Sequence, residues 1–63
     1  MQDGLIMNVI TICYQDNGTN CFWVMLNRKL QSVTLTKAGA EKQAKLIMKE
    51  LDIDCRVEYT TAY

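Results

Sequence analysis

Two apolar segments flanking Asn17-Gly18 constrain the fold of this chain more than any other feature. Ile6–Tyr14 and Cys21–Leu26 are rich in β-branched and aromatic residues and contain neither glycine nor proline, a composition typical of strands. Asn17-Gly18 is the strongest short-range hairpin signal, because both residues tolerate a positive φ. The sequence therefore predicts an antiparallel hairpin over residues 6–26.

The register of this hairpin stays open between two alternatives. A two-residue loop at Asn17-Gly18 pairs Tyr14 with Cys21, whereas a three-residue loop with a bulge pairs Cys13 with Cys21. We favour the second, because it collects large apolar side chains on one core face. That face holds Ile10, Ile12, Phe22, Val24 and Leu26. The other face holds Thr11, Cys13, Cys21, Trp23 and Met25.

A third, weaker strand is predicted after a polar turn. Asn27–Lys29 is the turn, and Leu30–Leu35 follows it with mixed polar and apolar residues. Strict alternation along this strand separates Leu30 from Val33, which places the two side chains on opposite faces of the sheet.

A helix is predicted over Lys37–Leu51. Thr36 is a suitable N-cap, because its hydroxyl can accept an unpaired backbone N–H. Glu41 and Lys45 are spaced for an ion pair along the helix. Gly39 is unfavourable inside a helix, so we expect it to mark a close approach to the sheet. The apolar positions share one face at the helical period: Ala40, Ala44, Ile47, Met48 and Leu51.

The C-terminal segment completes the predicted fold. After a short loop at Asp52–Asp54, Cys55–Tyr63 alternates as a half-buried strand. Because it follows a helix, it should run parallel to the first strand through a right-handed crossover. We predict an α+β fold of order ββ(β)αβ, a single sheet of three to four strands with one helix packed on one face. Residues 1–63 form one domain, and residues 1–5 are expected to be a weakly ordered leader.

The hairpin is apolar on both faces, and one helix can cover only one of them. A leftover apolar face on a soluble protein usually marks a binding surface. We therefore expect a protein partner, in the first place a second copy, to contact this face. The alternative is that the N-terminal segment, the C-terminal residues or strand twist covers it. The predicted interface residues are Thr11, Cys13, Cys21, Trp23, Met25 and, from the outer side of the helix, Leu46.

Nucleic-acid binding is the second hypothesis, based on uneven charge. Residues 27–49 carry six lysines and arginines against Glu41 alone, although the net charge of the chain is zero. Tyr14, Trp23, Tyr59 or Tyr63 could stack on bases. A dedicated nucleic-acid binder is usually basic over its whole footprint, which favours the protein-partner hypothesis. The candidate contacts are Arg28, Lys29, Lys42, Lys45 and Lys49.

Residues suited to catalysis or to metal binding are scarce. The chain has no histidine, and its three cysteines form no CxxC motif. Nucleophilic and acid–base catalysis usually rely on such groups. We expect no enzyme activity, no metal and no cofactor, with redox pairing of Cys13 and Cys21 as the competing hypothesis. The apolar stretch Leu5–Cys13 is too short to span a bilayer, so we expect a cytoplasmic protein without a membrane partner.

A resemblance to known domains extends over Cys21–Tyr59. The shared features are Trp23-x-Met25 in a strand, a polar turn, a short strand ending in Thr34-x-Thr36-Lys37, an alanine-spaced helix and a closing strand. On these motifs the chain resembles small ββαβ-type accessory domains of phages and bacteria. The resemblance implies a binding role and supplies no catalytic residue.

A hairpin followed by a helix is also similar to antitoxins of the partial ribonuclease-H type, but their glycine-rich segment between strand and helix is missing here. The small size of the chain suits a phage-encoded inhibitor of a host defence system, such as an anti-CRISPR protein, acting in the host cytoplasm. This is an association at the level of the class.

Overall fold

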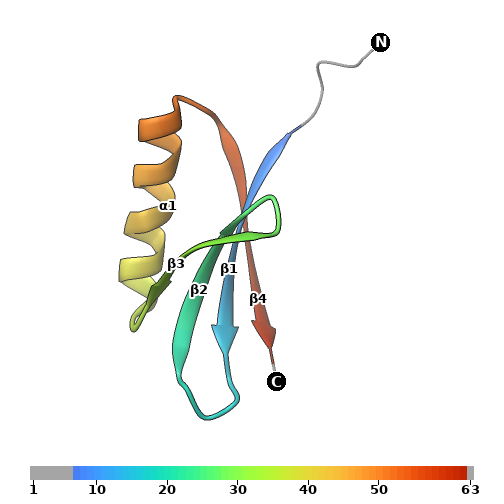
Figure 1. The fold of residues 1–63 in the computed structure, drawn as a ribbon, viewed down its shortest axis with the longest axis vertical. Coiled ribbons are helices and arrows are strands. Elements are labelled where there is room, and N and C mark those ends of the chain that lie inside the picture. Colours follow the sequence, from blue (N-terminus) through green and yellow to red (C-terminus); the bar gives the residue numbers. More distant parts are fainter. Residues whose placement is uncertain (1–6, 63) are drawn as a thin grey trace.

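A computed structural model describes residues 7–62, which form a four-stranded mixed sheet with one helix against it (Figure 1). The elements in chain order are β1 (Asn8–Gln15), β2 (Cys21–Leu26), β3 (Lys29–Thr34), α1 (Lys37–Leu51) and β4 (Cys55–Ala62). The predicted leader, the strand start at Ile6 and the strand end at Tyr63 lie outside the described residues.

The strands are ordered β3-β2-β1-β4 across the sheet. β2 is antiparallel to both β1 and β3, and β4 is parallel to β1. The predicted α+β class with a single sheet is confirmed, and so is the position of the last strand beside the first. The third strand, which the sequence left optional, is present and forms one edge of the sheet.

Both predicted registers of the first hairpin are wrong. Gln15 lies opposite Cys21 and Cys13 lies opposite Trp23, so the loop is Asp16–Asn20. The favoured register differs from the observed one by two residues. Because side chains alternate with a period of two, this shift leaves every residue on its predicted face.

The wide loop begins where β1 still pairs with β4. The backbone N–H of Asp16 donates to the carbonyl of Ala62 at 2.9 Å, so the ladder to β4 extends past the last pair with β2. The chain then reverses through positive φ at Gly18 and Asn20, 99° and 51°. Asn17 does not take a positive φ, so the turn that its sequence predicts does not form.

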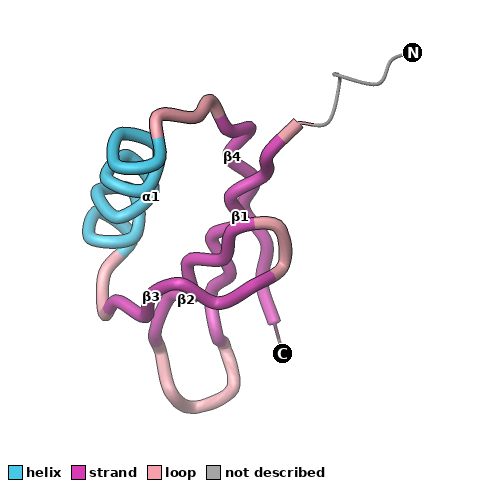
Figure 2. Tube along the Cα trace, turned by 45° about the horizontal axis from the view of Figure 1, so that its top comes forward, coloured by secondary structure: helices cyan, strands magenta, loops and turns pink. Residues whose placement is uncertain are grey.

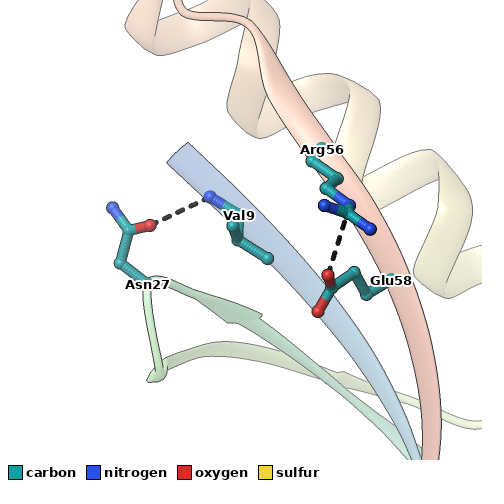
Figure 3. Close-up of polar contacts among 4 residues, drawn as sticks. All are labelled: Val9, Asn27, Arg56 and Glu58. Carbon is teal, nitrogen blue, oxygen red and sulfur yellow. Dashed lines mark hydrogen bonds and ion pairs between the residues drawn. The ribbon is translucent and has the colours of Figure 1, made fainter. Parts of the chain in front are cut away.

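The tight turn of the sheet lies instead between β2 and β3. Asn27 and Arg28 both have positive φ, 51° and 72°, as a two-residue hairpin turn requires. Asn27 donates its backbone N–H to the carbonyl of Val9 at 2.8 Å and accepts the N–H of Val9 on its side-chain Oδ1 at 2.9 Å (Figure 3). Its Nδ2 donates to Asn8 Oδ1 at 3.1 Å. One side chain thus fastens the second hairpin to the start of β1.

A bulge corrects the predicted alternation in β3. Ser32 pairs with Val24, but Leu30 pairs with Met25, so the register shifts between these two pairs. An extra residue in one strand reverses the alternation beyond it. Leu30 and Val33 therefore lie on the same face of the sheet, not on opposite faces.

The helix α1 begins as predicted. Thr36 Oγ1 accepts the N–H of Gly39 at 3.0 Å. A Cβ on Gly39 would lie 3.0 Å from Thr36 Oγ1 and 3.4 Å from Thr34 Cβ, which confirms a close approach to β3. Two predictions for the helix are wrong. Leu51 is exposed, and Glu41 accepts a hydrogen bond from Tyr59 Oη, with no ion pair to Lys45 among the described residues.

The core lies between α1 and one face of the sheet. Ile10, Ile12 and Val24 pack against Ala40 and Ala44, and all five are buried. The helix packs mainly on β2 and β3 and less on β1. Phe22, Leu26, Ile47, Met48, Cys55 and Val57 surround this cluster. Within residues 7–62, no helix has the length and apolar character that crossing a membrane requires.

Candidate functional site

The face of the sheet turned away from α1, here called the open face, carries most of the predicted interface. Thr11 pairs with Met25 and Cys13 with Trp23 across β1 and β2. These residues alternate with Ile10, Ile12 and Val24, which point into the core. The structure therefore brings Thr11, Cys13, Cys21, Trp23 and Met25 to one face.

The accessible part of the open face is an apolar patch on β2 and β3, formed by Trp23, Met25, Leu30 and Val33. Trp23 is 37% exposed, and Leu30 and Val33 are 50% and 51% exposed. Val33 lies opposite Trp23 and Leu30 opposite Met25. The sequence interpretation missed Leu30 and Val33. The alternation of β3 gave a signal for Val33, whereas the position of Leu30 depends on the bulge.

The cysteines of the open face contribute little surface. Cys13 and Cys21 are both buried. Gln15, which is also buried, donates from Nε2 to Cys13 Sγ at 3.3 Å, and Cys21 Sγ lies 3.6 Å from Thr19 Oγ1. These thiols therefore lie beneath the patch and contribute little to the surface that a partner could contact.

The redox hypothesis required Cys13 and Cys21 to face each other, and the structure does not place them so. Cys21 is opposite Gln15, which makes the two cysteines diagonal neighbours. Diagonal positions are roughly 7–8 Å apart, beyond the span that a disulfide usually bridges. Both thiols are free, as is that of Cys55.

Charge on the open face is confined to its margins. The residues that β1, β2 and the patch present there are uncharged. On β4, Arg56 Nε pairs with Glu58 Oε2 at 3.3 Å, and both side chains are largely exposed (Figure 3). Arg28 approaches the same margin from the β2–β3 turn and lines a shallow hollow with Val9, Thr11 and Glu58.

The predicted nucleic-acid contacts do not form one surface. Arg28 and Lys29 lie at the β2–β3 turn, whereas Lys42, Lys45 and Lys49 lie on α1. Figure 1 and Figure 2 both place the turn and the helix on opposite sides of β1. A single nucleic-acid strand cannot contact both groups along a short path. Leu46 is likewise on α1 and 38% exposed, apart from the other predicted interface residues.

Two side chains on the helix side of β4 have perturbed acidity. The pKa of Tyr59 is raised above its usual value because its hydroxyl donates to Glu41 Oε2 at 2.7 Å, with smaller effects from desolvation and the Glu41 charge. Burial, assisted by the charge of Asp54, raises the pKa of the Cys55 thiol. A raised thiol pKa lowers the fraction of reactive thiolate at neutral pH.

Comparison with known proteins gives no match of significance: no family model fits the chain, and no curated protein and no solved structure is similar to it. The geometry of the described residues therefore carries the functional argument.

Proposed function

We propose that this chain is a small, non-catalytic interaction protein that binds a second copy of itself through the open face. The observation that carries the proposal is the apolar patch on β2 and β3, in which Trp23, Leu30 and Val33 are each more than a third exposed. Exposed apolar side chains that gather on one face favour association, because contact removes them from water.

Charge supports a second copy as the occupant. The centre of the open face is uncharged, and its charged margin carries Arg56, which is paired with Glu58, and Arg28 from the β2–β3 turn. Stacking two such faces brings no like charges together at the centre of the contact, where an unpaired charge would be costly to bury.

The size of the face limits how tight the dimer can be. Four strands of about seven residues cover roughly 20 Å by 20 Å, from ordinary strand spacing and rise. Two copies would bury on the order of 800–1,000 Å² in total, below the standard size of a stable interface. We therefore expect a weak, concentration-dependent dimer.

Sedimentation velocity from low micromolar to millimolar concentration tests the proposal. The wild type should shift from monomer to dimer across this range, and Leu30→Lys should stay a monomer. The matched control is Leu51→Lys, because Leu51 is 54% exposed but lies on α1, away from the open face. A wild type that stays monomeric at millimolar concentration, or a Leu51→Lys effect equal to that of Leu30→Lys, would overturn the proposal.

The class suggested by the small size of the chain, a phage-encoded inhibitor, is part of the same proposal. An inhibitor of a host defence system in the cytoplasm would act by occupying a surface of a target protein, which requires an interaction face and no catalytic group. Binding of nucleic acid through the lysines of the helix is the second candidate. It is weakened by the separation of the basic residues, and no binding to duplex DNA at low salt would end it.

A further inference from the structure

A second surface, unrelated to the open face, lies on the helix side of the sheet. The helix starts at Lys37 and runs away from the β1–β2 loop, so the lower ends of β1, β2 and β4 extend beyond it (Figure 1). An open-sided cavity of about 350 Å³ lies at this end of the molecule, a volume at the small end of the range for ligand sites. Its lining includes Tyr14, Phe22, Tyr59, Lys37, Thr60 and Thr61.

Three aromatic rings from three strands meet in this cavity. Tyr14 and Phe22 lie directly opposite each other on β1 and β2, with ring centroids 4.9 Å apart and planes inclined by 41°. Tyr14 Oη donates to Asn20 Oδ1 at 3.2 Å, which fixes this ring from the loop. Tyr59 enters from β4, beside Ile12. All three rings keep some exposure to solvent.

Lys37 places a positive charge at the same cavity. Its Nζ lies 5.0 Å from the centroid of the Tyr59 ring, and no carboxylate pairs with it among the described residues. Glu41, four residues beyond Lys37 on α1, accepts a hydrogen bond from Tyr59 Oη and lines the adjacent cavity with Lys45 and Met48. Ile12 and Tyr59 line both cavities, whereas Glu41 lines only the second, which leaves the Lys37 side available to an anion.

We propose that this cavity binds a planar aromatic group that carries an anion, the chemistry of a nucleotide. The base would stack on the ring of Tyr59, which is 55% exposed, with Tyr14 and Phe22 beside it, since aromatic side chains accept any base through its π-face. The phosphate would contact the ammonium group of Lys37 and the hydroxyl of Thr61 on β4. The inference does not depend on the dimer, because the open face lies on the other side of the sheet.

An NMR titration with AMP tests both halves of this chemistry. AMP should shift the ring signals of Tyr14, Phe22 and Tyr59 and leave the indole of Trp23, on the open face, unchanged. Adenosine lacks the phosphate and ribose 5-phosphate lacks the base, so each should bind at least about fivefold more weakly, the loss expected for one charge-assisted or stacking contact. Equal shifts at Trp23, or no shifts at all, would overturn the proposal.

Two matched lysine variants test whether the phosphate of AMP binds at Lys37. Lys37→Gln should weaken AMP binding by about fivefold, whereas Lys42→Gln, an exposed lysine of the same helix outside the cavity, should not change it. If both variants weaken AMP binding equally, AMP responds to the overall charge of the protein, and the proposal that Lys37 binds the phosphate is wrong. Tyr59→Leu should weaken AMP and adenosine alike, because it removes a stacking surface and keeps Lys37.

A further titration distinguishes a free nucleotide from the end of a nucleic-acid strand. The affinities of thymidine monophosphate and of a short oligothymidylate are compared, using the same NMR signals of the three rings. Tighter binding of the oligomer, with a steep salt dependence, would indicate the end of a single strand. Equal affinities would indicate a free nucleotide. If AMP, thymidine monophosphate and oligothymidylate all fail to bind, the proposed site does not exist.

Discussion

The two faces of the sheet have similar apolar content in the sequence and differ in what covers them. On the helix side, Val24 is fully buried against α1, whereas on the open face Val33 is 51% exposed although it lies on the neighbouring strand. The difference shows that the apolar pattern of a strand determines which side chains share a face, but not whether another element packs on that face. With one helix in the described chain, one face forms the core and the other stays partly exposed.

The largest expected effect is a difference in the free energy of unfolding between variants of the two faces. Val24→Ala should lower the free energy of unfolding by about 2–3 kcal/mol, from lost burial and a residual cavity. Val33→Ala should change it by less than about 0.5 kcal/mol. Urea unfolding at a concentration where the protein is monomeric measures both. Equal losses would mean that the open face is part of a buried core.

A smaller effect is expected at the turn that positions β3, and with it Leu30 and Val33. Asn27→Ala removes the side-chain contacts to Val9 and Asn8 and places alanine at a positive φ. We expect a loss of about 1–2 kcal/mol. Asn17→Ala, in the exposed β1–β2 loop, is the control and should cost less than about 0.5 kcal/mol. The reverse order in thermal or urea unfolding would place the main structural turn at Asn17.

The smallest effect concerns the contact that joins β4 to the helix. The neutral Tyr59 hydroxyl donates to Glu41, and the pKa of Tyr59 is raised above its unfolded value. The stabilisation is therefore complete below about pH 10, the usual tyrosine value, and is lost as pH rises through the folded pKa. The difference in phenolate absorbance between wild type and Tyr59→Phe isolates this group. Glu41→Gln should lower its pKa, and an unchanged titration would show that the hydrogen bond does not form.

Much of the fold could be predicted from the sequence, because alternation and capping are local signals. The boundaries of β2 and α1 agree with their predicted ranges, and the N-cap at Thr36 is confirmed. The assignment of Trp23 and Met25 to the face away from the helix is also correct, even though the register was not. A slip of two residues preserves the face, so a period-two pattern determines sides without determining partners.

Only the tertiary structure decided the details on which the two candidate surfaces depend. The first loop spans Asp16–Asn20, and its first residue donates a hydrogen bond to Ala62 on β4. The bulge in β3 brings Leu30 beside Met25. The aromatic cavity joins Phe22, Tyr14 and Tyr59 from strands that are neighbours only in the folded sheet. The sequence by itself determined which residues are strand, helix and core, because those preferences act over a few residues. Pairing partners, bulges and cavities depend on contacts between distant segments, and these exist only once the sheet has formed.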